Sequence, residues 1–231
     1  MIDSKGCFIT GTDTGVGKTY IAARLIRGLQ NLGISVRPRK PVESGCSLED
    51  GCLVPEDALL LSNTAGNLEP LDRVCPYRFA APISPERAAR MERRSLSLQD
   101  LVAACQIHAQ HFLLVEGAGG FHSPIASNSL NADLAQALGL PIIIVAADRL
   151  GTINQVLLTA EAVINRRLDL LAVILNQIEP CTTTGDMNNA EDLQIWLNNV
   201  PIIQTPYGNG TISAESLEVI RPLLERLTVL N

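Results

Sequence analysis

Short apolar runs alternate with amphipathic stretches along most of this chain. Apolar runs flanked by polar or turn-forming residues predict strands at Cys7–Thr10, Ser35–Lys40, Phe112–Val115, Pro141–Val145, Leu171–Leu175 and Ile202–Gln204. Apolar residues at helical spacing predict helices at Lys18–Leu32, Glu56–Ser62, Leu98–His108, Asn131–Leu138, Asn154–Arg166, Ala190–Asn198 and Ser213–Leu227. Strands that are apolar on both faces suit a sheet covered on both sides. The pattern therefore predicts an α/β fold, in which a doubly wound, mostly parallel sheet has helices on both faces.

The length and composition of the chain bound its organisation. With 231 residues, 46% of them hydrophobic, the chain can bury one sizeable core, so we expect a single domain over residues 1–231. The segments 43–55 and 178–189 are rich in Gly, Ser, Thr and Asn, and we expect them to be mobile loops. The longest apolar run, Leu140–Ala147, is far too short to span a bilayer, and the N-terminus is too polar for a signal peptide. We therefore expect a cytoplasmic protein that does not bind membranes.

The charge balance argues against some partners. The formal net charge is −6, which disfavours a general binder of nucleic acids or anionic membranes. Arginines at 87, 90, 93 and 94 form the one basic cluster. On a helix, Arg87, Arg90 and Arg94 would share a face, and such a cluster is most often a solvated helix surface.

The cysteines give no sign of a metal site. Six are scattered along the chain without a Cys-x-x-Cys pair, at positions 7, 46, 52, 75, 105 and 181. His108 and His111 lie near Cys105, but this small cluster lacks the paired spacing of a zinc site. We interpret the cysteines as reduced residues that are mostly packed or in loops.

The strongest functional signal is Gly-Thr-Asp-Thr-Gly-Val-Gly-Lys-Thr at 11–19, between a predicted strand and a predicted helix. Such a loop offers backbone N–H groups and the positive end of the helix to an anion. Lys18 can then supply a charge for the β- and γ-phosphates, and the Thr19 hydroxyl a ligand for Mg²⁺. Five residues separate Gly11 from Gly17, one more than in the commonest version of the motif. A glycine-rich turn without a ligand would not require this strand and helix, so the segment predicts a nucleoside triphosphate site.

Two further polar residues follow predicted strands. Ligands of an open parallel sheet gather beyond the carboxyl ends of its strands. Glu116 directly follows Phe112–Val115, and an acid there can hold Mg²⁺ opposite the phosphate loop. Asp13 and Asp57 are the other acids within possible reach of the metal. A turn with a surface glutamate is the alternative for Glu116.

Lys40 ends the predicted strand Ser35–Lys40, and Pro41 disfavours helix at that position. A lysine offered from an extended backbone can stabilise charge on a transferring phosphoryl group or on a carboxylate-like acceptor. The alternative is an ordinary lysine at a strand end that extends into solvent.

Five segments, in the order in which they occur, closely resemble the dethiobiotin synthetase family. They are Gly-Thr-Asp-Thr-Gly-Val-Gly-Lys-Thr (11–19), Lys-Pro-Val-Glu-Ser-Gly (40–45), Pro-Tyr-Arg-Phe-Ala-Ala-Pro-Ile-Ser-Pro (76–85), Val-Glu-Gly-Ala-Gly-Gly (115–120) and Leu-Gly-Thr-Ile-Asn (150–154). The long phosphate loop is itself a family trait, whereas Val-Glu-Gly-Ala-Gly-Gly is shared with related amidotransferase-type synthetases. The match runs to about Asn176 and thins beyond it.

The resemblance implies a P-loop NTPase fold and an ATP- and Mg²⁺-dependent ring closure in biotin biosynthesis. The family joins CO₂ to one amine of 7,8-diaminopelargonate as a carbamate, which ATP phosphorylates to a carbamic-phosphoric anhydride. The second amine attacks this anhydride and closes the ureido ring of dethiobiotin. Two anions must meet, and two lysines, a metal and a helix terminus would neutralise them.

The resemblance also implies roles for individual residues. The nucleotide would be bound by Thr14, Gly15, Val16, Gly17, Lys18, Thr19, Tyr20, Asn176 and Pro206. The substrate would be bound by Thr14, Lys40, Ser44, Gly119, Gly151, Thr152 and Asn154. Thr19, Asp57 and Glu116 would hold Mg²⁺, Lys18 and Lys40 would be catalytic, and Asn176 would read adenine.

The family further implies a homodimer with a shared site. A second subunit would lend its Gly-x-Ile-Asn loop, here Gly151, Thr152 and Asn154, to hold the substrate carboxylate. Two positions depart from the family pattern, because Gly15 stands where some members have an acid and Asp192 where some have an aromatic residue.

Three alternative functions are disfavoured by the sequence. A partitioning or maturation ATPase, which acts on a protein partner, usually has an additional lysine early in the phosphate loop, where this chain has Thr12, Asp13 and Thr14. A GTPase reads guanine with Asn/Thr-Lys-x-Asp, whereas this chain has Asn-Gln-Ile-Glu at 176–179. A regulator with decayed catalysis would not retain Lys40 and Glu116. The ATPase switch remains the main alternative.

Overall fold

A six-stranded sheet runs through the residues that the computed structural model describes, which are 5–108, 110–180, 187–207 and 221–229. In spatial order its strands are β12 (Ile202–Thr205), β11 (Leu170–Asn176), β10 (Ile142–Ala147), β1 (Gly6–Gly11), β7 (Phe112–Gly120) and β2 (Val36–Arg39). Every pair of neighbours is parallel. The six predicted strands and the parallel sheet are confirmed.

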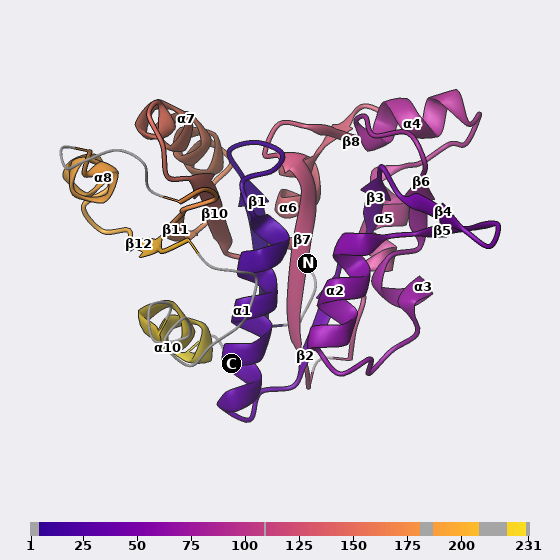
Figure 1. Ribbon diagram of the computed structural model, residues 1–231, viewed down its shortest axis with the longest axis horizontal. Coiled ribbons are helices and arrows are strands. Elements are labelled where there is room, and N and C mark those ends of the chain that lie inside the picture. Colours follow the sequence, from indigo (N-terminus) through magenta and orange to yellow (C-terminus); the bar gives the residue numbers. More distant parts are fainter. Residues whose placement is uncertain (1–4, 109, 181–186, 208–220, 230–231) are drawn as a thin grey trace.

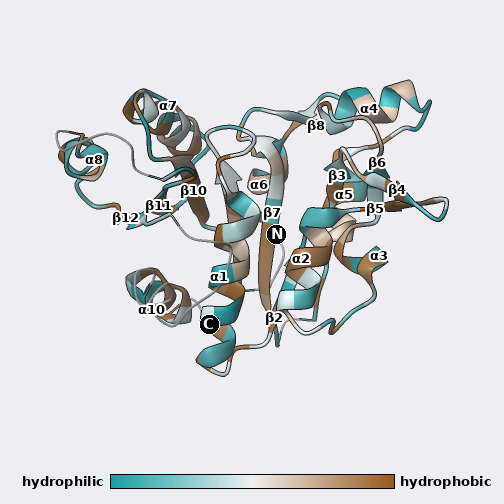
Figure 2. Cartoon of the chain, in the orientation of Figure 1, coloured by the Kyte–Doolittle hydropathy of each residue, from teal (hydrophilic) through white to brown (hydrophobic). Residues whose placement is uncertain are grey.

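Helices cover both faces of the sheet (Figure 1). One face carries α1 (Lys18–Asn31), α2 (Glu56–Thr64) and α10 (Arg221–Val229). The other face carries α4 (Pro85–Met91), α5 (Leu98–Ala104), α6 (Asn131–Leu138), α7 (Thr152–Asn165) and α8 (Asn189–Trp196). Because side chains alternate along a strand, Phe8 of β1 packs into one core while Cys7 and Ile9 pack into the other. Figure 2 shows the result in β7, which is hydrophobic along most of its length.

The predicted helices are confirmed with small changes at their ends. Helix α7 begins at Thr152, two residues before the predicted start at Asn154. Helix α5 ends at Ala104 and not at His108, because the N–H groups of Cys105 and Gln106 bond to carbonyls three residues back and tighten the last turn. The first part of the predicted helix Ser213–Leu227 lies outside the described residues, and α10 covers the rest.

Residues 43–55, predicted to be a loop, contain short strands, so that prediction is wrong. Strand β3 (Val42–Ser44) pairs in parallel with β6 (Tyr77–Phe79), and β4 (Ser47–Glu49) forms a hairpin with β5 (Cys52–Val54). Asp50 and Gly51 join the hairpin with φ values of 48° and 78°, as a tight two-residue turn requires. Residues 181–186 of the other predicted loop, with Cys181, lie outside the described residues.

Three short elements complete the described structure: helix α3 (Leu71–Val74) and the paired strands β8 (Pro124–Ala126) and β9 (Ser129–Leu130). The described cysteines, at 7, 46, 52, 75 and 105, form no disulfide. Within the described ranges, no helix has both the length and the apolar character needed to cross a bilayer.

Candidate active site

The phosphate loop connects β1 to α1 and depends on its glycines. Gly15 and Gly17 have φ values of 77° and 90°, which other residues rarely adopt. A Cβ on Gly11 would meet the Asp13 carbonyl oxygen at 2.7 Å, so that residue is needed for a close backbone approach. Lys18 curls back over the loop, and its Nζ donates to the Asp13 carbonyl oxygen at 2.9 Å.

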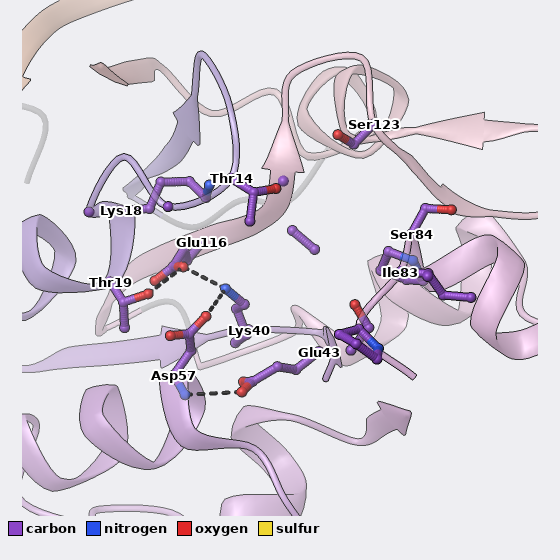
Figure 3. A pocket seen from close by; sticks show the side chains of 17 residues that line it. Thr14, Lys18, Thr19, Lys40, Glu43, Asp57, Ile83, Ser84, Glu116 and Ser123 are labelled. Carbon is purple, nitrogen blue, oxygen red and sulfur yellow. Dashed lines mark hydrogen bonds and ion pairs between the residues drawn. The ribbon is translucent and has the colours of Figure 1, made fainter. Parts of the chain in front are cut away.

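Lys40, at the end of β2, lies between two carboxylates (Figure 3). Its Nζ is 2.8 Å from Asp57 Oδ2 and 2.5 Å from Glu116 Oε1. The Thr19 hydroxyl donates to the same Glu116 oxygen at 2.9 Å. The side chains of Lys40 and Glu116 are only 4% and 0% exposed, whereas that of Asp57 is 45% exposed and reaches solvent. Residues from α1, α2 and β7 thus meet Lys40, the residue after β2, in one ionic cluster.

The pKa values of this cluster follow from burial and charge. Burial lowers the pKa of the Lys18 ammonium to about 8, and the neighbouring Lys40 charge adds to the effect. Burial opposes the charged form of Lys40 too, but the carboxylates of Glu116 and Asp57 outweigh it and hold the pKa of Lys40 above its usual range. Burial would raise the pKa of Asp57, yet its pKa is lowered because Lys40 dominates. Lys40 is therefore a permanent cation in this cluster.

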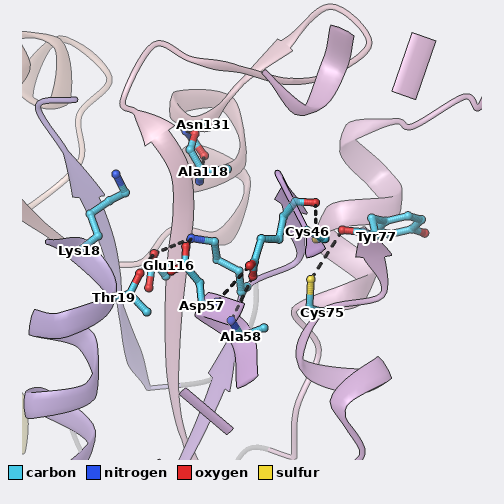
Figure 4. Close-up of polar contacts among 12 residues, drawn as sticks. Lys18, Thr19, Cys46, Asp57, Ala58, Cys75, Tyr77, Glu116, Ala118 and Asn131 are labelled. Carbon is cyan, nitrogen blue, oxygen red and sulfur yellow. Dashed lines mark hydrogen bonds and ion pairs between the residues drawn. The ribbon is translucent and has the colours of Figure 1, made fainter. Parts of the chain in front are cut away.

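Glu43 supports the cluster from behind, a role that the sequence did not reveal. Its carboxylate oxygens accept hydrogen bonds from the backbone N–H groups of Asp57 (labelled with Glu43 in Figure 3) and Ala58 (labelled in Figure 4), each at 3.0 Å. These groups form the first turn of α2, where a carboxylate is favoured. Burial raises the pKa of Glu43. Glu43 thus fixes the start of the helix that carries Asp57.

A cavity of about 650 Å³ opens over the phosphate loop. Its lining brings together the predicted residues Thr14, Gly15, Gly17, Lys18, Thr19, Lys40, Ser44, Asp57, Glu116 and Gly119. Its lining also includes residues that were not predicted as site residues: Glu43, Pro82, Ile83, Ser84, Pro85, Ala118 and Ser123. Residues 82–85 belong to the matched segment 76–85, which was the available signal. Lys40 and Glu116 face the cavity above Gly17, so both side chains can contact a ligand bound there.

The predicted adenine reader is held against the phosphate loop. Asn176, at the end of β11, donates from Nδ2 to the Val16 carbonyl oxygen at 3.1 Å and accepts from the Thr205 hydroxyl at 2.9 Å. A Cβ on Gly17 would lie 2.2 Å from this amide nitrogen. Pro206 directly follows Thr205 and is exposed at the same edge of the sheet. Tyr20, in the first turn of α1, has the Arg24 guanidinium 5.4 Å from its ring centre.

The three residues predicted to serve a second subunit lie at the start of α7 and do not line this cavity. Gly151 precedes the helix with φ 91°, and Gly151 and Asn154 are exposed. Thr152 is fully buried and its N–H donates to the Arg149 carbonyl oxygen at 3.2 Å, so Gly151 and Asn154 are the residues of this group that are open to a ligand.

The donor set fits a magnesium ion. Glu116 Oε2 is buried and has no hydrogen-bond partner among the residues that the structure describes, so one carboxylate oxygen is open to a ligand. Thr19 and Asp57 place two more oxygen ligands beside it. Mg²⁺ takes oxygen ligands and is commonly bound by one or two carboxylates together with substrate phosphates. Within the described part of the chain, no group of three or more His, Cys, Asp or Glu residues forms a metal site.

Comparison with known proteins assigns the family. A family model described as "AAA domain" matches residues 5–205. The ATP-dependent dethiobiotin synthetase BioD of Vesicomyosocius okutanii subsp. Calyptogena okutanii (strain HA) is 48% identical over 176 residues, covering 76% of this chain and 80% of that protein. The protein of the same name from Anaeromyxobacter dehalogenans (strain 2CP-C) is 40% identical over 205 residues, covering 88% of this chain and 90% of that protein.

A solved structure gives the same fold at low identity. The septum site-determining protein MinD of Pyrococcus horikoshii OT3, complexed with Mg-ADP, has a TM-score of 0.57 and 17% identity, covering 96% of both chains. This likeness concerns the fold alone, whereas the identity to the synthetases extends over most of the chain. The chain therefore belongs to the ATP-dependent dethiobiotin synthetase family.

Proposed function

We propose that this chain converts 7,8-diaminopelargonate, CO₂ and ATP to dethiobiotin as a single, cytoplasmic, Mg²⁺-dependent ligase domain. The observation that carries the proposal is the convergence of Lys18, Lys40, Asp57 and Glu116 in one cavity over the phosphate loop. Family membership supports the reaction, and the charge distribution supports the mechanism.

The phosphate loop and its neighbours bind the nucleotide. The N–H groups of residues 15–19 would face the phosphates, with Lys18 over the β- and γ-phosphates, while the Thr14 N–H donates to Asp13 Oδ1. The exposed Pro206 and the amide of Asn176 form the edge where adenine is read. Val16 and Gly17 fix the distance between this edge and the loop, because the Val16 carbonyl accepts from Asn176. Tyr20 flanks the first turn of α1.

Thr19, Asp57 and Glu116 would hold Mg²⁺, which supplies positive charge to the transferring phosphoryl group. All three line the same cavity, Thr19 donates to Glu116 Oε1, and Glu116 Oε2 has no hydrogen-bond partner within the described ranges. When the carboxylates of Asp57 and Glu116 bind a metal ion, their ion pairs with Lys40 are weakened. Lys40 is then free to bind the carbamate.

Phosphoryl transfer follows from the placement of the two lysines. A carbamate oxygen attacks the γ-phosphorus of ATP and ADP leaves, with Lys18 and Lys40 balancing the negative charge of the two reacting anions. The second amine then attacks the carbamate carbon, loses a proton and expels phosphate, which carries away the oxygen that formed the anhydride. Ser44, Thr14 and the Gly119 backbone border this space and position the diamine. The role of the chain is positioning and charge stabilisation, with no covalent intermediate on a side chain.

The working unit is a homodimer in which α7 of one subunit approaches the cavity of the other. Leu150, just before α7, and Leu158, in the middle of α7, are 90% and 59% exposed and give a second copy apolar surface to cover. The exposed Gly151 and Asn154 would offer N–H groups at the start of this helix to a carboxylate, whereas the buried Thr152 donates to the Arg149 carbonyl oxygen and would help to fix that turn. Their position outside the cavity of their own chain supports a role toward a partner.

The test is product formation by the purified chain with ATP, Mg²⁺, bicarbonate and 7,8-diaminopelargonate, measured by mass spectrometry. We expect dethiobiotin, ADP and phosphate in equal amounts, and none when the diamine is omitted. ATP hydrolysis that ignores the diamine and rises with a protein partner would replace this proposal with the switch ATPase.

A further inference from the structure

A second cavity lies beside the amino-terminal ends of β2 and β7, away from the phosphate loop. Its volume is about 360 Å³, and it is lined by Arg37, Glu69, Arg73, Gln106, Ile107, His108 and His111. His111 immediately precedes β7, whose nine residues span about 30 Å toward the phosphate loop. The cavity is therefore separate from the candidate active site.

This cavity has a surplus of positive charge. Buried Arg39 donates to both oxygens of Glu69, at 2.7 Å and 2.9 Å, and Arg37 Nε lies 3.6 Å from the same carboxylate. Within the described ranges, Arg73 has no ion pair and donates only to the Gln106 carbonyl oxygen, at 3.4 Å. Three arginines against one glutamate leave two positive charges unbalanced, in a chain whose formal net charge is −6.

His111 adds a hydrogen-bond donor that has no acceptor. Its Nε2 lies 3.2 Å from Arg37 Nη2 and 3.4 Å from Gln110 Nε2, and both of these nitrogens can only donate. Nε2 must therefore accept, which leaves the proton of the neutral ring on Nδ1. That atom is buried and has no hydrogen-bond partner. Among the described residues the ring of His111 therefore accepts through Nε2, and its Nδ1 proton has no acceptor.

We propose that this arginine–histidine cavity binds a small, multiply charged oxyanion of the phosphate class. Guanidinium groups present paired N–H donors that match phosphate oxygens, and a dianion would balance the two surplus charges. The exposed imidazole of His108 also lines the cavity and can add a donor. The volume admits a phosphate or a phosphate monoester, the two sources of this chemistry.

The three histidines of the chain provide the test. His108 and His111 line the cavity, whereas His122 lies in a groove with Asp13 at the far end of β7 and serves as an internal control. The ring signals are followed by NMR while inorganic phosphate replaces chloride at constant ionic strength, with the phosphate loop filled by Mg²⁺ and a non-hydrolysable ATP analogue. We expect the signals of His108 and His111 to shift in a saturable way, and those of His122 to stay constant.

Two matched variants remove the same charge at different places. Arg73→Gln removes one guanidinium group from the cavity and should weaken phosphate binding at least about tenfold, which is the effect of losing one charge-assisted hydrogen bond. Arg87→Gln removes an exposed arginine on α4 outside the cavity and should change binding less than about twofold. Titrations with phenyl phosphate identify the source, because tighter binding than phosphate indicates an organic monoester and weaker binding indicates the free ion.

The proposal is overturned if all three histidines shift alike and without saturation in the wild-type protein. Equal losses in Arg73→Gln and Arg87→Gln would overturn it as well, because the effect would then come from net charge alone. The wild-type histidine signals decide the question even if a variant folds poorly.

Discussion

The two ends of β2 treat positive charge in opposite ways. At the carboxyl end, Lys40 is paired with both Asp57 and Glu116, so the cation is balanced before any ligand binds. Beside the amino end, around the arginine–histidine cavity, Arg37 and the last strand residue Arg39 share the single carboxylate of Glu69, and Arg73 is left over. The ion pairs of Lys40 hold the reacting side chains in place until substrate and metal replace the paired groups. The unpaired positive charge of the arginines favours the binding of an anion.

The two ends also differ in the type of cation, lysine at one and arginine at the other. A lysine ammonium is a compact charge that can exchange one anionic partner for another during a reaction. An arginine fork binds a planar or tetrahedral anion through two parallel hydrogen bonds and fixes its geometry. We therefore assign chemistry to the lysine end and static anion recognition to the arginine end, and each prediction below tests one side of this contrast.

The largest effect is expected from Lys40→Ala. Removing the cation that faces the carbamate should lower kcat by about 10² to 10³, as loss of one transition-state donor does. The dissociation constant for ATP should change only a few-fold, because Lys18 and the loop bind the phosphates. Steady-state kinetics and calorimetric ATP titration measure both quantities. If ATP binding collapses instead, Lys40 belongs to the nucleotide site.

Glu116→Gln tests the metal side of the same cluster. Losing the carboxylate charge should raise the Mg²⁺ concentration for half-maximal activity by at least about tenfold. Activity measured against Mg²⁺ at fixed ATP gives this value, and Asp100→Asn, an exchange at the start of α5 away from the cavity, is the matched control. An unchanged Mg²⁺ requirement would remove Glu116 from the metal site.

Glu69→Gln tests the arginine end without touching the chemistry. It leaves buried Arg39 without a carboxylate, and since Glu69 is 23% exposed we expect a loss of about 2 kcal/mol in the free energy of unfolding, below the range for fully buried pairs. Turnover should stay within about twofold. A strong loss of activity with normal stability would show that the two ends are not separate.

The same pair gives a pH dependence. Burial raises the pKa of Glu69, but Arg39 outweighs it and the pKa lies below its ordinary value. The folded protein then binds this proton less readily than the unfolded chain, so the stabilisation is complete above the unfolded pKa and is lost as pH falls through the folded pKa. Denaturation at pH 7 and at acidic pH should show the difference between wild type and Glu69→Gln shrinking in acid.

The smallest loss of stability is expected from Glu43→Ala. The substitution removes the acceptor for the N–H groups of Asp57 and Ala58, which should lower the free energy of unfolding by about 1 kcal/mol. Because Asp57 is then less firmly placed, kcat should fall several-fold with little change in ATP affinity. Glu43→Gln keeps one acceptor oxygen and should lie between the two. Equal activity of all three proteins would limit Glu43 to stability.

Local sequence patterns predicted the sheet strands and the phosphate loop, because each of these is determined by residues that are adjacent in the sequence. The strands are apolar on both faces, and the loop residues 11–19 need only their own neighbours to form the turn. The short strands β3 and β6 were not predicted, because three-residue strands are defined by their pairing across 35 residues and not by a local period.

The site residues that lie in family motifs were predicted. The contacts that hold them in place were missed, because they join residues far apart in the sequence. Glu43 lies within the matched segment 40–45, yet its role depends on N–H groups 14 and 15 residues further along the chain. Asn176 was named as a site residue, but its contact with Val16 joins residues 160 positions apart. The arginine–histidine cavity is likewise assembled from β2, α3 and the segment before β7, and only His108 and His111 stood out in the sequence, as a cluster that lacks zinc spacing.

The most direct test of the central claim, that Lys18 and Lys40 bring a carbamate to ATP as phosphoryl acceptor, follows the oxygen atoms. A brief reaction is started with CO₂ labelled with oxygen-18 in unlabelled water, and the released phosphate is analysed by mass spectrometry. Transfer to the carbamate predicts one labelled oxygen in each phosphate, carried over when the anhydride is opened by the amine. Phosphate without label would mean that water attacks ATP, and the account of the lysine end would be wrong.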